Sequence, residues 1–165
     1  MPDHTPIDKN RRVVVLASAG MLVSASLSGT RSASGQTAPA SKLKIGVIGA
    51  GHIGSTVGGL WIKAGHPVLF SSRHPEELNG LVANLGSLAR NGTVEQAIQF
   101  GDVVFIAVPY GALPNIGLGY AKPLAGKIVL DANNAVPSRD GPIAEEVEHN
   151  GIGITSQKYL PGTRL

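Results

Sequence analysis

The sequence predicts an α/β fold built on a doubly wound parallel sheet. Three observations support this prediction: short apolar runs alternate with segments of helical periodicity, one run leads directly into a glycine-rich turn, and aromatic residues make up only 4% of the chain. Alternating strands and helices are typical of a parallel sheet with right-handed crossovers. The chain has 165 residues, which is enough for one such domain and a short appendage.

The first expected strand ends in a glycine turn. Residues 42–54 read KLKIGVIGAGHIG, an apolar run followed by GxGxxG. The order of strand, glycine turn and helix is that of a dinucleotide-binding site. Gly49 permits the tight turn, Gly51 lets the backbone approach a pyrophosphate, and Gly54 lets the helix lie close to the strand. The N–H groups of the first helical turn, which contains His52 and Ile53, are expected to face the phosphates. The alternative is a structural turn that binds nothing.

The other elements are expected in regular order. A helix over residues 53–64 should end at Gly65, because its apolar residues form one face up to that glycine. Thr93 should cap a helix that runs to residue 100, with Gln96 completing a capping box. Glu76 and Glu77 are expected only to favour the first turn of a helix that begins at Pro75. Further strands are expected over residues 66–72, 87–90, 102–108 and 127–132, a short helix over 143–148, a poorly periodic bridge over 112–124, and the start of a sixth strand over 152–155.

The end of the second strand indicates the cofactor. An NAD site carries an Asp or Glu there, about 20 residues beyond the glycines, which binds the ribose 2′-hydroxyl. This chain has Ser71, Ser72, Arg73 and His74 at that place. Two hydroxyls and a guanidinium suit a 2′-phosphate, because arginine binds phosphate oxygens through charged hydrogen bonds. NADP is therefore expected in preference to NAD, while His74 either stacks on the adenine or lies in solvent.

The residues after the fourth and fifth strands should border the reacting part of the cofactor. Val108 and Pro109 are apolar and stiff, so they suit contact with the face of a ring. Tyr110 is either a hydrogen-bond donor or a loop aromatic. Asp131 and Asn134 more often hold loops than carry protons at such a position. No catalytic residue is predicted, because hydride transfer relies on the cofactor's own chemistry.

Composition excludes several other kinds of site. The chain has no cysteine, which excludes disulfides, thiolate metal sites and a cysteine nucleophile. Its five histidines lack ligand spacing, so no metal site is predicted. Most of the formal net charge of +3 belongs to the first 40 residues, and the remainder has no basic patch with interleaved aromatics. Nucleic acid is therefore not expected as a partner.

Residues 1–40 have the pattern of an export signal. A basic segment with the pair Arg11-Arg12 precedes an apolar stretch over residues 13–27, and the motif APA follows at 38–40. The arginine pair partly matches a twin-arginine signal, which exports proteins already folded around a cofactor. Residues 41–165 are then an exported, periplasmic domain. Sec export, a retained membrane anchor, or a cytoplasmic protein with a non-functional extension are the alternatives.

These motifs together resemble a known family. GVIGAGHIGSTVGGLWIKAGHPVLFSSR, DVVFIAVP and KIVLDANN are similar to the NADP-binding N-terminal domain of deazaflavin (coenzyme F420)-dependent NADP reductases. The same domain type occurs in pyrroline-5-carboxylate reductases and in some membrane ferric reductases. The resemblance implies a Rossmann fold with the pyrophosphate at residues 49–54 and the 2′-phosphate at residues 71–73. It also implies that the nicotinamide lies near Val108 and Pro109, with Asn134 close by.

The sequence differs from the family's pattern in three respects. It carries the export-like leader, Ala135 follows Asn134 where relatives commonly have proline, and the chain stops at Leu165. Relatives continue there into a helical domain that closes over the substrate and often makes the dimer. We expect an NADP(H)-binding domain that transfers hydride between NADPH and a flavin-like or deazaflavin acceptor, apparently without that C-terminal part. The alternatives are the N-terminal domain of a pyrroline-5-carboxylate or other imine reductase, and a non-catalytic NADP-binding module.

Overall fold

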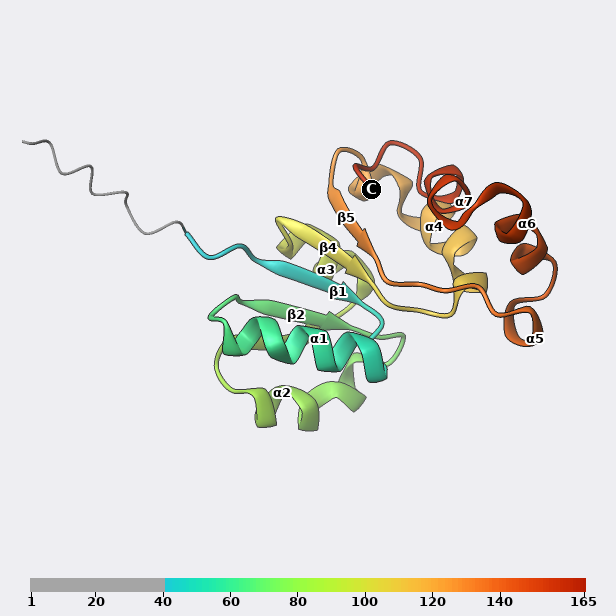
Figure 1. Ribbon diagram of the computed structural model, residues 1–165. Coiled ribbons are helices and arrows are strands. Elements are labelled where there is room, and N and C mark those ends of the chain that lie inside the picture. The colour runs from blue at the N-terminus through green and yellow to red at the C-terminus, as the bar shows by residue number, and fades with distance from the viewer. Residues whose placement is uncertain (1–40) are drawn as a thin grey trace, which may run out of the picture. The chain divides into compact units, whose positions relative to one another are not determined.

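The computed structural model describes residues 41–165, and the expected leader lies outside the described residues. A five-stranded sheet runs through this part in the order β3-β2-β1-β4-β5, and every neighbouring pair of strands is parallel. The strands are β1 (Ile45–Ile48), β2 (Val68–Ser71), β3 (Ala89–Gly92), β4 (Val103–Ile106) and β5 (Ile128–Asp131). This arrangement confirms the predicted doubly wound parallel α/β fold (Figure 1).

Helices cover both faces of the sheet. The helices are α1 (His52–Lys63), α2 (Asn79–Leu85), α3 (Val94–Phe100), α4 (Leu113–Leu124), α5 (Pro137–Asp140), α6 (Pro142–Asn150) and α7 (Ile152–Tyr159), with single 3-10 turns η1 (Pro75–Leu78) and η2 (Tyr110–Ala112). The helices α1 and α2 pack on one face, and α3 and α4 pack on the other. Within residues 41–165 no helix combines the length and the hydropathy that a membrane crossing requires.

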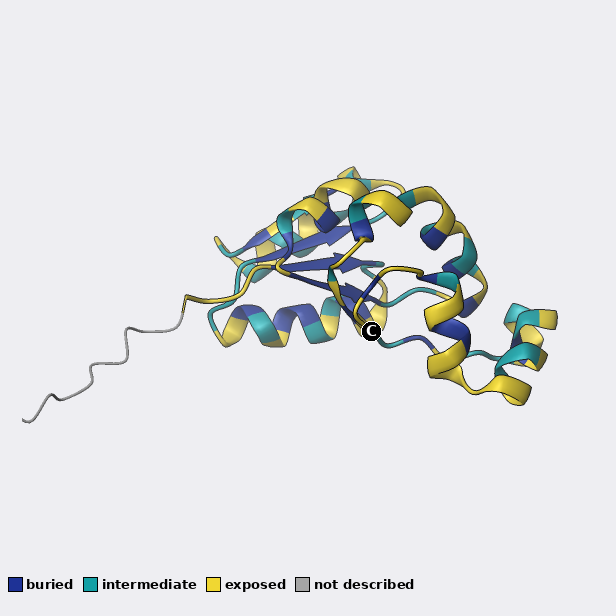
Figure 2. Ribbon diagram, turned by 90° about the horizontal axis from the view of Figure 1, so that it is seen from above, coloured by how far each residue is buried: buried dark blue, intermediate teal, exposed yellow. Residues whose placement is uncertain are grey.

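The core follows the two-residue period of the strands. Phe70 and Phe105 contact the α1 side, whereas Ile48, Val104 and Ile106 join the cluster under α3 and α4. The central strands are therefore buried on both faces, as Figure 2 shows. A strand covered on both faces has a continuous run of apolar residues. For this reason the ranges predicted from the sequence for β1, β2 and β4 agree with the structure to within two residues at either end.

Local signals at helix ends behave as the sequence predicts. Gly65 has a φ of +90° and follows Ala64, the C-cap of α1, and the N–H groups of Gly65 and His66 donate to carbonyls of the last turn. At α3, Thr93 Oγ1 accepts a hydrogen bond from the Gln96 N–H, and Gln96 Oε1 accepts one from the Thr93 N–H. This is the predicted capping box.

The expected bridge over residues 112–124 is a helix instead. Its periodicity was obscured because α4 bends at Tyr120, whose φ and ψ of −125° and 21° are not helical. Pro123 lies within the same helix, and a proline both lacks the N–H that would bond one turn back and crowds the carbonyl there. The bend therefore has a local cause in the sequence.

The prediction of a sixth strand over residues 152–155 is wrong, because these residues begin α7. Ile152 and Ile154 are exposed, while Thr155 and Ser156 are buried, so the buried face of α7 carries small polar residues rather than the apolar ones. Within the described residues, the sheet is extended beyond β5 only by Arg164, which forms a parallel bridge with Ile128.

Asp140 ties the C-terminal segment to the turn that follows β4. Its Oδ1 accepts a hydrogen bond from the Gly111 N–H at 3.0 Å, and its Oδ2 accepts one from the Val136 N–H at 2.7 Å. The Arg139 guanidinium donates to both oxygens, and the Asp140 side chain is only 1% exposed. These hydrogen bonds, above all those of Arg139, hold the pKa of Asp140 well below its usual range.

We expect Asp140→Asn to lower the free energy of unfolding by about 1–3 kcal/mol at pH 7, because a buried charged acceptor is lost. A lowered folded-state pKa gives stability that is present above the ordinary Asp pKa of about 4 and is lost as the pH falls further. The difference between the wild-type and variant proteins should therefore shrink below about pH 4. Urea unfolding at neutral and acidic pH measures it, with the exposed Glu148→Gln as control. A difference that stays constant down to about pH 3 would contradict this account.

Candidate functional site

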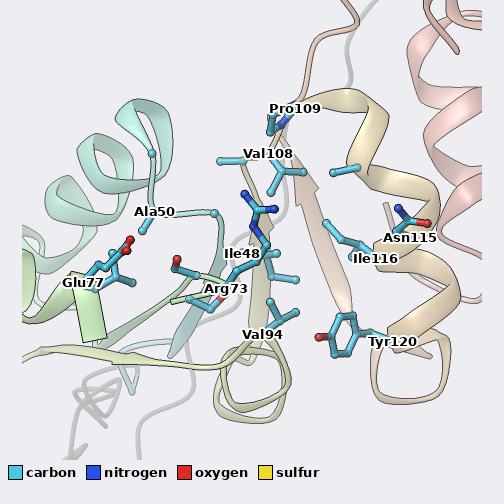
Figure 3. A pocket seen from close by; sticks show the side chains of 17 residues that line it. Ile48, Ala50, Arg73, Glu77, Val94, Val108, Pro109, Asn115, Ile116 and Tyr120 are labelled. Atoms are coloured by element: carbon cyan, nitrogen blue, oxygen red, sulfur yellow. The ribbon is translucent and has the colours of Figure 1, made fainter. Parts of the chain in front are cut away.

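A cavity of about 730 Å³ opens at the carboxyl ends of β1, β2 and β4 (Figure 3). The strands β1 and β4 are neighbours, but the chain leaves β1 into α1 on one face and leaves β4 into α4 on the other. In parallel α/β folds, ligands bind in the crevice that such a divergence creates. The volume lies within the range of small-molecule and cofactor sites.

Three glycines shape the turn between β1 and α1 at the cavity. Gly49 has a φ of +95°, and a Cβ placed on it would overlap the Ala107 carbonyl. A Cβ on Gly54 would overlap the Gly49 carbonyl, so this glycine permits the close packing of α1 on the turn. A Cβ on Gly51 would meet no atom within 4 Å. Gly51 therefore leaves space in the cavity, whereas the other two allow the backbone to pack.

The first turn of α1 begins at this glycine turn. The Ser55 N–H donates to the Gly51 carbonyl at 2.9 Å, and the N–H groups before it have no carbonyl partner within the helix. Gly49 and Gly51 line the cavity, whereas the predicted residues His52, Ile53 and Gly54 are absent from its lining. The side chains of His52 and Ile53 are exposed, and their backbone N–H groups belong to the first turn of α1.

Three of the four residues predicted at the end of β2 line the cavity, but they differ in what they offer a ligand. The Ser71 hydroxyl is fully buried and donates to the Val47 carbonyl at 2.8 Å. The Ser72 hydroxyl accepts from the His74 N–H at 3.1 Å, which leaves its own hydrogen free to donate. Arg73 is exposed, and Figure 3 shows its guanidinium directed toward Val108.

His74 does not line the cavity. Its Nδ1 lies 3.5 Å from Glu76 Oε1, and both side chains are largely exposed. The His74 side chain therefore faces solvent next to Glu76.

The end of β4 contributes an apolar rim that Asn133 anchors. Val108 and Pro109 line the cavity, and the Val108 N–H donates to Asn133 Oδ1 at 2.8 Å. Asn133 is buried, and its own N–H donates to Asp131 Oδ1. The predicted Asn134 is exposed and lies outside the cavity lining. Two adjacent asparagines face different ways, and the sequence carries no signal that tells which one turns inward.

The side of the cavity opposite the end of β2 was not predicted from the sequence. Asn115, Ile116 and Tyr120 of α4 line the cavity, as does Val94 at the start of α3 (Figure 3). The inward face of α4 could not be assigned from a segment expected to lack regular periodicity. Glu77 also lines the cavity, although its place in the sequence indicated only a helix start.

Tyr110 is fully buried and is absent from the cavity lining. Its hydroxyl lies 2.9 Å from Ser156 Oγ of α7, and burial raises the pKa of the phenol. It is therefore a buried hydrogen-bonding aromatic that holds η2 against α7.

The residues of the cavity suit a dinucleotide. Gly51 leaves open space beside the N–H groups at the start of α1, Arg73 supplies a positive charge, and Val108, Pro109 and the α4 residues supply apolar surface. Phosphates bind at such helix starts, and flat rings bind against apolar walls. Residues 41–165 contain no group of three or more metal-ligating His, Asp or Glu side chains.

Comparison with known proteins agrees with this geometry. Residues 44–135, more than half of the chain, match the family described as "NADP oxidoreductase coenzyme F420-dependent". The metalloreductase STEAP3 of Rattus norvegicus is 32% identical over 94 residues, which are 55% of this chain and 18% of that protein.

Two solved structures are also similar. A putative F420-dependent NADP-reductase from Arthrobacter sp. FB24 superposes with a TM-score of 0.61 at 25% identity, over 73% of this chain and 59% of that one. A hypothetical protein from Sinorhizobium meliloti superposes with a TM-score of 0.59 at 29% identity, over 74% of this chain and 58% of that one. This chain thus spans less than two thirds of the length of these relatives.

The matched segment contains the glycine turn and the end of β2, on which the expectation of NADP was based, and also the end of β4. The match to a family of NADP oxidoreductases confirms the prediction of NADP as the cofactor and the predicted resemblance to coenzyme F420-dependent NADP reductases. The chain belongs to the coenzyme F420-dependent NADP oxidoreductase family.

Proposed function

We propose that residues 41–165 bind NADP(H) in the cavity and serve hydride transfer between NADPH and a flavin-like or deazaflavin acceptor. The observation that carries the proposal is the open space at Gly51, which adjoins the start of α1 and shares one cavity with Arg73. A helix start and an arginine are two independent anion-binding features, and a dinucleotide with a 2′-phosphate carries an anion for each.

In this proposal the backbone of residues 49–54 holds the pyrophosphate. Ser72 and Arg73 hold the 2′-phosphate, while Ser71 fixes the strand end through its bond to Val47. The role of His74 would be contact with the adenine. Hydroxyl and guanidinium donors to a phosphate are charge-assisted hydrogen bonds, which are stronger than neutral ones.

The nicotinamide is proposed to lie against Val108 and Pro109, with Asn134 nearby. NADPH, when bound, supplies the hydride. The protein's part is orientation and exclusion of water, since cofactor chemistry of this kind needs a fixed ring more than an acid or base. The hydrogen bond from the Val108 N–H to Asn133 supports this role, because it holds the rim in one position.

The acceptor is proposed from the family description, which names coenzyme F420. A planar deazaflavin or flavin ring can meet a nicotinamide face to face, and the open cavity leaves one side of such a ring accessible. A non-catalytic NADP-binding module is the rival proposal, and it differs only in lacking turnover.

The full chain should oxidise NADPH when a deazaflavin or flavin acceptor is added, because the domain presents the nicotinamide to a planar ring. Loss of the NADPH absorbance at 340 nm, compared with a sample lacking protein, measures the reaction. Saturable NADPH binding with no oxidation by either acceptor would favour the non-catalytic module.

We expect Gly51→Val to abolish binding of both NADPH and NADH while the domain stays folded. The new side chain would fill the space that Gly51 leaves open, and it would meet no protein atom at its Cβ. Calorimetric titration measures binding, and circular dichroism reports the fold. Gly80→Val is the matched control, because Gly80 also has open space around it but lies in α2, away from the cavity. Undiminished binding by Gly51→Val would place the pyrophosphate elsewhere.

Arg73→Ala should weaken NADPH binding by about 1.5–3 kcal/mol and NADH binding much less, because only NADPH loses a charge-assisted contact. Titration of the variant with both nucleotides measures the two losses. Arg90→Ala, which removes an exposed arginine outside the cavity lining, is the control. Equal losses for the two nucleotides would remove Arg73 from the 2′-phosphate site.

A further inference from the structure

Glu77 places a negative charge in the lining of the same cavity as Arg73. Both side chains line it, and Figure 3 shows Glu77 on the α1 side of the cavity and the Arg73 guanidinium on the side of Val108. Among the described residues, Glu77 has neither a salt bridge nor a side-chain hydrogen bond. Its charge is therefore not neutralised by a protein partner.

Glu77 is exposed, but the backbone that carries it is held by hydrogen bonds. The Glu77 N–H donates to the His74 carbonyl at 3.1 Å within η1. Asn91 of β3 donates from Nδ2 to the Pro75 carbonyl at 2.7 Å and to Asn79 Oδ1 at 2.9 Å, which fastens both ends of η1 to the sheet. The turn thus carries Glu77 at a set position beside the end of β2.

We propose that Glu77 determines how strongly the site discriminates between NADPH and NADH, by opposing the preference that Arg73 creates. The inference rests on the proposed binding of the cofactor in this cavity. A carboxylate near the adenosine ribose repels a 2′-phosphate and can accept a hydrogen bond from a 2′-hydroxyl. Arg73 would have the opposite preference, so the selectivity of the site would be the difference between the effects of the two side chains. NADH should therefore remain a usable ligand of the wild-type protein.

Glu76 gives a matched control for this effect. It is the adjacent acid on the same turn, but it faces His74 and is absent from the cavity lining. Glu76→Gln and Glu77→Gln remove the same formal charge one residue apart, so a general electrostatic effect would appear in both. Only a local effect on the ribose site would appear in Glu77→Gln alone.

The test is titration of the full chain and both variants with NADPH and with NADH at low salt. For Glu77→Gln we expect the ratio of the NADH Kd to the NADPH Kd to rise by about threefold to tenfold, the size expected for one partly solvated charge. Repeating the titration at high salt should reduce that change, because salt screens exposed charges. For Glu76→Gln the ratio should change less than about twofold.

An unchanged ratio in Glu77→Gln, or an equal rise in both variants, would overturn the inference. Circular dichroism of the variants confirms that they are folded, so a lost effect cannot arise from misfolding. A different result would contradict the proposed function itself. If the wild-type chain bound neither nucleotide, the cavity would not be a cofactor site, and the inference about Glu77 would also be wrong.

Discussion

The close contact between the glycine turn and the first turn of α1 is the constraint on which the rest of the site depends. Gly54 lies against the Gly49 carbonyl, and Gly49 lies against the Ala107 carbonyl at the end of β4. A Cβ at either position would push α1 or the turn away from the sheet. The start of α1 can therefore reach the crevice between β1 and β4 only because these two residues lack a side chain. The open space at Gly51 adjoins the start of α1 only because the turn and the helix pack in this way.

The cavity divides by polarity along its length. Backbone N–H groups, the Ser72 hydroxyl and Arg73 lie at the ends of β1 and β2, whereas Val108, Pro109 and the α4 wall are mostly apolar. A ligand with anionic groups at its centre and flat rings at its ends meets complementary surfaces on this arrangement. Glu77 differs from the other polar groups of the lining because it carries a negative charge. In the proposed site, cofactor choice would be a balance between two opposite charges that line the same cavity.

The sequence predicted the sheet and the phosphate end of the site better than the opposite wall. Buried parallel strands and the GxGxxG turn are local patterns, so β1, β2, β4, the helix end at Gly65 and the Thr93 capping box could be read directly. The face of α4 could not be read, because the bend at Tyr120 interrupts its period. In α7 the apolar residues point outward and small polar residues point inward, which reverses the usual pattern. The choice of Asn133 over Asn134 depends on a contact with Val108, 25 residues away, which no local pattern contains.

The turn after β4 is held mainly by residues from much later in the chain. Val108 is bonded to Asn133, Gly111 to Asp140 and Tyr110 to Ser156, over sequence separations of 25, 29 and 46 residues. Contacts between distant residues are costlier to form, because closing a longer loop costs more conformational entropy. The apolar rim of the site therefore depends on the docking of the C-terminal segment. A nucleotide that contacts the rim and the glycine turn would stabilise that docking, because a ligand stabilises the conformation that binds it.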